Sequence, residues 1–153
     1  MIRKRTNNVL GEKGYMNIKV YDKLPKQAKY IREAVFMKEQ GFKNEFDDID
    51  NRAIHLVLYV DDEPAATCRI FFSDEHKCYM IGRLAVLSEY RGTNLSKKIL
   101  ENAQSEIRKQ GGKITMLSAQ YRLKKFYENI GYKVKGDTYL DEGCPHILMS
   151  MEL

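Results

Sequence analysis

The sequence has few of the features that mark membrane, fibrous or disordered proteins. No apolar run approaches the roughly 20 residues that a membrane-spanning helix needs. No segment recurs at a fixed spacing, which excludes collagen, coiled coils and repeat arrays. Hydrophobic residues make up 43% of the chain and charged residues 31%, which is ordinary for a folded protein and unlike a disordered one. The 153 residues fit one domain better than two.

Cysteine and histidine are scarce too, with three of each. The cysteines form no C-x-x-C pair and the histidines form no H-x-x-x-H pair, so no metal site is expected. The chain starts with basic residues, but no apolar stretch follows them as it would in a secretory signal. Three cysteines in a chain without such a signal are typical of reduced thiols, and we therefore expect a cytoplasmic protein.

Positive charge is concentrated at one end of the chain. Residues 1–14 carry +3 of the formal net charge of +5, so the other residues are together nearly neutral. A protein that binds nucleic acid electrostatically needs a basic face on its folded domain. We therefore expect no nucleic-acid partner and no membrane. We interpret residues 1–15 as a flexible basic arm and residues 16–153 as the folded domain.

The spacing of apolar residues predicts an alternation of strands and helices. Strands are expected at residues 16–21, 54–60, 65–72, 78–86, 114–119, 132–139 and 146–153, and helices at 24–40, 95–109 and 123–130. The strand at 114–119 follows a helix, so it should run parallel to the strand at 78–86. The expected fold is a single α/β domain. Its mixed, mostly antiparallel sheet contains one central parallel β-α-β step and has flanking helices.

The loop at residues 87–94 opens the helix predicted at 95–109. The first amides of a helix have no partner within the helix, and the helix dipole favours an anion beside them. The backbone N–H groups of residues 92–97 could therefore hold a pyrophosphate, with positive charge from Arg91, Lys97 and Lys98. The spacing fits neither a P-loop nor a dinucleotide fingerprint. On spacing alone, an ordinary surface turn is the alternative.

Three ordered motifs go beyond spacing. One coenzyme motif has Gln or Arg first, Gly fourth and Gly or Ala sixth; here it is matched by Arg91-Gly92-Thr93-Asn94-Leu95-Ser96. Asn94 and Ser96 replace the two small residues, and asparagine adopts a positive φ more readily than most residues. The other two motifs are Phe126-Tyr127-Glu128 with Gly131-Tyr132, and the strand Gly82–Val86. On these motifs, residues 16–153 resemble the Gcn5-related N-acetyltransferase (GNAT) superfamily.

Within the superfamily, the chain resembles the small ElaA/YjcF-like proteins and the glyphosate N-acetyltransferase group. The most specific match is the ending Pro145-His146-x-x-Met149. The resemblance implies the acyl-CoA N-acyltransferase (GNAT) fold and acetyl-CoA as a co-substrate. It also implies transfer of the acetyl group to a primary amine of a small molecule, which attacks the thioester directly in a ternary complex.

The resemblance also assigns coenzyme contacts. Backbone atoms of Leu84, Ala85 and Val86 would pair with the pantetheine, and a backbone N–H there would polarise the thioester carbonyl. The pyrophosphate would lie on the residues of the loop and helix start, namely Arg91, Gly92, Thr93, Asn94, Leu95 and Ser96.

Two side chains are expected to move protons. The resemblance implies that Tyr127 contacts the coenzyme and protonates the leaving sulfur; a core tyrosine is the alternative. It implies that His146 is the base, because an imidazole with a pKa of about 6.5 accepts a proton readily at neutral pH. The alternative for His146 is a structural histidine at a strand end. Glu39 acting through water, or His55, would then be the base.

The expected acceptor contacts are Arg32, Glu39, His55, Arg69, Arg83 and Gln120. The three arginines lie on elements predicted to border the central sheet. Convergence of two of them would indicate an acceptor with an anionic group, and structural ion pairs are the alternative. The glyphosate group has arginines where this chain has Gly82 and Gln120, which argues against glyphosate-like dianions as substrates.

The acidic residues Glu45, Asp47, Asp48 and Asp50 lack the spacing of an EF-hand. We interpret them as part of a solvated loop at 42–51, with attraction of a cationic amine as the alternative. A loop of this length would more naturally cover a small pocket than border an open peptide groove. Two further functions stay open, namely a non-catalytic acyl-CoA-binding regulatory module and a protein or peptide N-acetyltransferase. The sequence names neither the acceptor nor the oligomeric state, for which a homodimer is one option.

Overall fold

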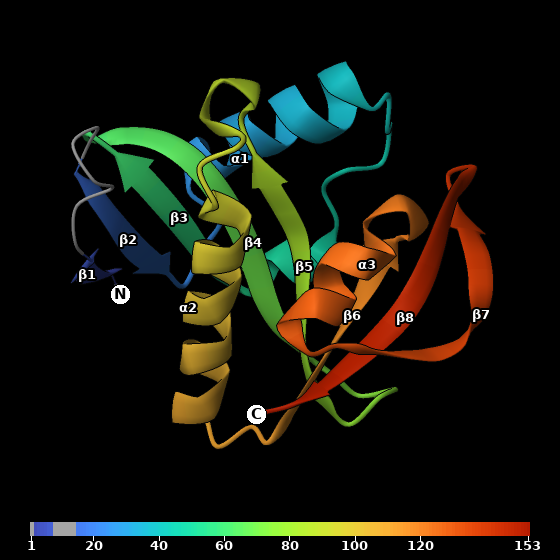
Figure 1. The fold of residues 1–153 in the computed structure, drawn as a ribbon. Helices are drawn as coiled ribbons and strands as arrows, with labels where there is room; N and C mark the ends of the chain where they lie inside the picture. The colour runs from blue at the N-terminus through green and yellow to red at the C-terminus, as the bar shows by residue number, and fades with distance from the viewer. Residues whose placement is uncertain (1, 8–14) are drawn as a thin grey trace.

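The computed structural model describes residues 2–7 and 15–153, and its strands form one mixed eight-stranded sheet (Figure 1). The strand order is β1-β2-β3-β4-β5-β6-β8-β7. The strands are β1 (Ile2–Asn7), β2 (Met16–Tyr21), β3 (Ile54–Val60), β4 (Glu63–Ser73), β5 (Cys78–Val86), β6 (Ile114–Gln120), β7 (Lys133–Asp141) and β8 (Cys144–Glu152). The helices are α1 (Lys26–Arg32), the π-helix η1 (Glu33–Glu39), α2 (Leu95–Lys109) and α3 (Lys124–Ile130), with short 3-10 turns η2 (Asp48–Asn51), η3 (Ser88–Tyr90) and η4 (Tyr121–Leu123).

Helices cover both faces of the central strands. The buried residues Ile99 and Ile107 of α2 share one core with Leu56 of β3. Ala28 of α1 belongs to a second core, together with Val57 on the opposite face of β3. Because both faces are covered, β3 is a nearly continuous apolar run, IHLVLYV, and not an alternating pattern.

The parallel step in the sheet is short, and this creates the opening that matters for function. β5 and β6 pair only through Tyr79 with Thr115 and Met80 with Met116. Beyond these pairs the two strands separate. β6 continues along β8 instead, in antiparallel register from Ile114 to Gln120. The carboxyl-terminal ends of β5 and β6 therefore border an opening in the sheet.

The predicted fold class is confirmed, and the predicted strands and helices are found with small shifts at their ends. One difference is the helix predicted at 24–40, which is an α-helix followed by the π-helix η1. A second is β1, which the sequence did not predict and which pairs with β2. Of the rest of the expected basic arm, residue 1 and residues 8–14 lie outside the described residues. Among the described helices, none has the length and apolar character needed to span a membrane.

Candidate active site

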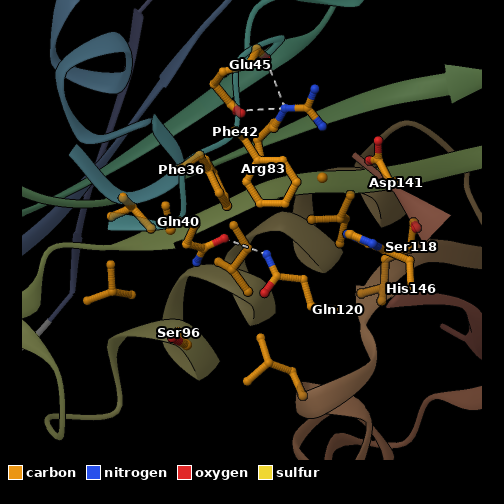
Figure 2. Close-up of a pocket in the computed structure, with 18 of the residues that line it drawn as sticks. Phe36, Gln40, Phe42, Glu45, Arg83, Ser96, Ser118, Gln120, Asp141 and His146 are labelled. Carbon is orange, nitrogen blue, oxygen red and sulfur yellow. Dashed lines mark hydrogen bonds and ion pairs between the residues drawn. The ribbon is translucent and has the colours of Figure 1, made fainter. Parts of the chain in front are cut away.

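A cavity of about 660 Å³ lies where β5 and β6 separate (Figure 2). Residues 81–86 of β5 line one wall, and Leu117, Ser118 and Gln120 of β6 line another. The remaining walls come from η1 and the loop after it, from the start of α2 and the loop before it, from η4 and α3, and from β7, β8 and the turn between them. The cavity therefore joins segments from almost the whole length of the domain.

A bulge in β5 shapes the first wall. Thr67 pairs with Ala85 and Arg69 pairs with Gly82, so β5 has one residue more than β4 between these pairs. Arg83 lies in the bulge with a φ of +51°, a left-handed conformation that few non-glycine residues adopt. Along the cavity, the β5 edge that faces β6 has no partner among the described strands. Its backbone groups can bind an extended ligand as an added strand.

Two residues with positive φ shape the start of α2. Gly92 has a φ of +82°, and Asn94, which precedes the helix, has a φ of +67°. Asparagine tolerates this left-handed conformation, so its replacement of a small residue in the motif is compatible with the turn. The side chain of Asn94 does not cap the helix. The first backbone N–H groups of α2 are therefore available to an anionic ligand.

Arg91 ties this loop to η1. Its Nε donates to the carbonyl oxygen of Val86 at 3.1 Å, and its guanidinium pairs with the Glu39 carboxylate at 2.9 Å. Arg91 and Glu39 both line the cavity, as predicted site residues should. The carboxylate of Glu39 is already used in this ion pair, which weakens the case for Glu39 as a base.

The π-helix η1 brings Val35 and Phe36 to the cavity wall. The Gln40 N–H donates to the Val35 carbonyl oxygen at 3.2 Å, the wide spacing that defines a π-turn. Such turns are rare and are frequent at functional sites. The Gln120 side-chain amide donates to Gln40 Oε1 at 2.7 Å, so a hydrogen bond crosses the cavity (Figure 2). The apolar spacing in the sequence does not distinguish a π-turn from an α-helical one, which is why η1 was not predicted.

Tyr127 lies on the cavity wall with only 6% of its surface exposed. The rings of Phe126 and Tyr132 contact its ring edge to face, at centroid distances of 5.1 and 5.8 Å. Burial raises the pKa of the Tyr127 phenol well above its ordinary value, so the hydroxyl keeps its proton at neutral pH. Among the described residues, the hydroxyl has no hydrogen-bond partner. Tyr127 can therefore donate a proton to a group bound in the cavity.

His146 lines the cavity from β8 and is 7% exposed. Its Nδ1 lies 2.8 Å from the carbonyl oxygen of Cys144. A carbonyl oxygen can only accept a hydrogen bond, so Nδ1 carries the hydrogen and the lone pair of the neutral ring is on Nε2. Nε2 is therefore the atom that can take a proton from a bound group. Figure 2 shows the His146 ring beside Ser118 on the cavity wall.

Arg32 and Arg69, both predicted to contact an acceptor, do not line the cavity. They lie in a buried ionic network with acidic residues of the segment 45–50. Arg32 binds the two carboxylate oxygens of Asp50 at 2.7 and 3.0 Å and Glu45 at 3.2 Å. Arg69 binds Asp47 at 2.6 Å and Asp50 at 3.0 Å. Their guanidinium groups are used by these carboxylates, which favours the alternative of structural ion pairs.

The same network corrects two further expectations. Glu45 and Asp50 are buried, so the acidic run is not simply a solvated loop; the arginines need buried carboxylates as counter-charges. His55 is buried and does not line the cavity, and its Nε2 lies 3.0 Å from the Asp50 carbonyl oxygen. Burial lowers the pKa of His55 and outweighs the opposing effect of Asp50. His55 is thus a structural residue beside the network.

Of the three predicted arginines, Arg83 alone lines the cavity. Its Nε lies 2.7 Å from Glu45, and its Nη2 lies 3.4 Å from Asp47. Burial raises the pKa of Glu45, although Arg83 and Arg32 oppose this effect. Burial and the charge of Arg69 lower the pKa of Arg83. The Arg83 side chain is 26% exposed, so it can contact a ligand as well as Glu45.

Most of the predicted site residues meet at this one cavity. Those that line it are Glu39, Arg83, Leu84, Ala85, Val86, Arg91, Ser96, Gln120, Tyr127 and His146. Gly92, Thr93, Asn94 and Leu95 shape the adjoining start of α2 without lining the cavity. Lining residues that the sequence did not predict include Phe36, Gln40, Phe42, Ser118, Asp141 and Glu142. Gln40 follows the predicted site residue Glu39, and Ser118 lies two residues before the predicted site residue Gln120, which is the signal that could have found them.

Comparisons with known proteins agree with this geometry. The profile of the acetyltransferase (GNAT) domain family matches residues 22–153. YjcF of Bacillus subtilis, an uncharacterized N-acetyltransferase, is 31% identical over 127 residues, which cover 81% of this chain and 89% of that protein. The crystal structure of Escherichia coli ElaA has a TM-score of 0.79 and 26% identity, covering 91% of this chain and 99% of that one.

An acyl-CoA N-acyltransferase from Pseudomonas aeruginosa shares the fold at 24% identity, with a TM-score of 0.77 and coverage of 90% of this chain and 99% of that one. These matches confirm the family resemblance inferred from the three sequence motifs. They extend over nearly the whole domain and include every element that lines the cavity. The chain therefore belongs to the GNAT acetyltransferase family.

Proposed function

We propose that this protein transfers the acetyl group of acetyl-CoA to a primary amine of a small molecule, which attacks directly in a ternary complex. One observation carries the proposal. The cavity between β5 and β6 combines an unpaired strand edge, an uncapped helix start, a protonated tyrosine and an imidazole with a free nitrogen. Membership of the family supports acetyl transfer as the type of reaction.

The residues around the cavity fit acetyl-CoA as a co-substrate. When bound, it supplies the acetyl group as an activated thioester. Backbone groups of Leu84, Ala85 and Val86, on the unpaired edge of β5, would hold the pantetheine. Backbone amides at the start of α2, near Ser96, would hold the pyrophosphate. These amides have no acceptor within the helix, and no side chain caps them.

Two side chains would handle the protons. Nε2 of His146 would take a proton from the attacking amine, and the hydroxyl of Tyr127 would give one to the leaving sulfur. The raised pKa of Tyr127 means that its position, and not unusual acidity, would make it a donor. His146 suits the base role better than Glu39, whose carboxylate is paired with Arg91.

A contact between two loops that border the cavity favours a small acceptor over a peptide. The Lys43 N–H donates to the Glu142 carboxylate at 3.1 Å, which joins the loop after η1 to the turn between β7 and β8. Asp141 and Glu142 add negative charge to the cavity wall, which suits an amine that arrives as a cation. Arg83, on the β5 wall of the cavity, would contact a polar group of the acceptor.

The proposal includes a cytoplasmic location. The three cysteines are free, with Cys68 and Cys78 buried and Cys144 partly exposed. Free thiols are usual in a reducing compartment. No nucleic acid or membrane is needed for the proposed reaction, and a homodimer stays a prediction.

The proposal is tested by a CoA-release assay with acetyl-CoA and a library of primary amines. We expect at least one amine to release CoA and to be recovered in acetylated form by mass spectrometry. His146→Ala should lower kcat for that amine by about 100-fold or more, since general base catalysis commonly contributes this much. Its Kd for acetyl-CoA, measured by calorimetry, should be unchanged. His76→Ala, at a histidine that does not line the cavity, is the matched control.

Each contrary outcome has a distinct meaning. Binding of acetyl-CoA without acetylation of any amine or peptide would favour the non-catalytic acyl-CoA-binding module. Acetylation of peptides alone would favour the protein or peptide acetyltransferase. Full activity of His146→Ala would leave acetyl transfer intact and remove His146 as the base.

A further inference from the structure

His146 contacts a second side chain that the proposed chemistry does not use. The ring of Tyr139 on β7 stacks beside the imidazole, with ring centroids 6.1 Å apart and planes inclined at 29°. The two residues are direct partners in the register of β7 and β8. Tyr139 does not line the cavity. It therefore contacts the imidazole without reaching the space where ligands would bind.

The far end of Tyr139 is fixed to another strand. Its hydroxyl forms a hydrogen bond with the hydroxyl of Ser118 on β6. Ser118 lies two residues before Gln120, which is the partner of His146 in the register of β6 and β8. The Tyr139 side chain thus extends from β7 across β8 to β6, past His146. Held at its hydroxyl and along its ring, Tyr139 is a rigid neighbour for the imidazole.

A bulge in β7 is what puts a tyrosine at this position. Between Lys135 and Tyr139, β7 carries two residues more than the segment of β8 with which it pairs. Gly136 lies in the bulge with a φ of +86°, a conformation that glycine adopts without strain. In a regular register, Asp137 would face His146. The bulge replaces that carboxylate with an uncharged ring, and bulges often redirect side chains next to active sites in this way.

We propose that Tyr139, anchored by Ser118, is a positioning residue for His146. The proposal depends on the role of His146 as base in the proposed function. The Cys144 carbonyl holds Nδ1, and the Tyr139 ring limits rotation of the imidazole about its own bond to the backbone. Together they keep Nε2 directed at the cavity. Accurate placement matters, because an error of about 1 Å in a reacting group can cost roughly 100-fold in rate.

The first test is a double-mutant cycle with Tyr139→Ala and His146→Ala, measured with an amine that the wild type acetylates. Tyr139→Ala should lower kcat by about 10-fold and leave KM for acetyl-CoA unchanged. In the His146→Ala background it should have no further effect on kcat. Equal effects in both backgrounds, or none in the wild type, would overturn the proposal. Tyr139→Phe keeps the ring and loses the Ser118 contact, so its kcat should lie between those of the wild type and Tyr139→Ala.

Tyr30→Ala is the matched control for this cycle. Tyr30 lies on α1 with 56% of its surface exposed, against 44% for Tyr139, and it does not line the cavity. The change removes another exposed tyrosine ring, which lies on α1 and not on the cavity wall. It should leave kcat unchanged, and thermal melting should show that both variants are folded.

The second test needs no acceptor. Nitrogen NMR of protein with labelled histidine reports the tautomer of each imidazole, and His146→Ala identifies the His146 signals among those of three histidines. We expect protonated Nδ1 in the wild type and mixed or broadened tautomer signals in Tyr139→Ala. Unchanged signals in Tyr139→Ala would overturn the positioning role. A failure to find any acetylated amine, with the expected change in signals, would overturn only the proposed function.

Discussion

Tyr127 and Tyr132 show how surroundings separate two neighbouring residues of the same type. Both are buried, their rings meet edge to face, and burial raises the pKa of each phenol, that of Tyr132 to about 12. The hydroxyl of Tyr132 accepts a hydrogen bond from Gln104 at 3.1 Å, away from the cavity. The hydroxyl of Tyr127 has no such partner among the described residues and lines the cavity. One phenol is therefore structural and the other is free to donate its proton.

This contrast predicts different results for the same substitution. Tyr127→Phe should lower kcat by about 10- to 100-fold, because it removes the donor to the leaving sulfur, and should leave the Kd for acetyl-CoA unchanged. Tyr132→Phe should leave kcat unchanged and cost about 1–3 kcal/mol of unfolding free energy, because the phenol loses its hydrogen bonds with the buried Gln104 and Thr115. CoA release and urea unfolding measure the two quantities. Equal loss of kcat in both variants would show that Tyr127 acts through packing.

At the scale of elements, residues 45–50 are held in place by charge. Arg32 and Arg69 are buried, and Asp50 bridges them with contacts of 2.7 and 3.0 Å. Burial opposes the ionisation of Asp50, but hydrogen bonds from Arg32 and Arg69 and the charge of Arg32 outweigh it and lower its pKa from 3.8 to about 2. The same segment contributes Glu45 to the cavity wall. The network thus holds part of the cavity wall in place at the proposed acceptor site.

The network predicts a specific loss of stability in acid. A carboxylate with a lowered pKa stabilises the folded state above its unfolded pKa, and this contribution is lost as the pH falls from about 4 towards 2. The raised pKa of Glu45 acts in the opposite sense and offsets part of the loss. Asp50→Asn should cost about 3–5 kcal/mol at neutral pH, because it leaves buried arginines without their shared carboxylate.

Urea unfolding of wild type and Asp50→Asn from pH 7 to pH 2 measures this contribution. The difference in unfolding free energy between the two proteins should shrink below about pH 4. Asp48→Asn, at an exposed residue of the same turn, is the control and should change stability by less than about 0.5 kcal/mol at any pH. A constant difference between wild type and Asp50→Asn across this range would contradict the role of the Asp50 charge.

At the scale of the whole molecule, the order of strands from β2 to β8 and of the helices between them was predictable, because apolar spacing separates strands from helices. Among the residues that line the cavity, those in motifs, such as Tyr127 and His146, were predictable. The partners of Arg32 and Arg69 were not, because they depend on the path of a loop that carries no periodic pattern. The Tyr139 contact depends on a bulge that shifts the register of β7 by two residues, and a shift of two keeps every side chain on its own face, so the alternation in the sequence does not reveal it.

The proposed function requires acetyl-CoA to bind at the opening between β5 and β6 and at the start of α2. Ser96→Glu tests it directly. A glutamate in the first turn suits the helix dipole, so the variant should fold, but its charge would repel a pyrophosphate. Ser105→Glu, the same change farther along α2, is the matched control.

Calorimetric titration with acetyl-CoA and with CoA therefore tests most directly whether the coenzyme binds at this site. We predict near-stoichiometric binding by the wild type and by Ser105→Glu, and a Kd at least about 10-fold weaker for Ser96→Glu, equivalent to about 1.4 kcal/mol. No binding by the wild type up to millimolar acetyl-CoA, or equal affinity for wild type and Ser96→Glu, would contradict binding of acetyl-CoA at this site.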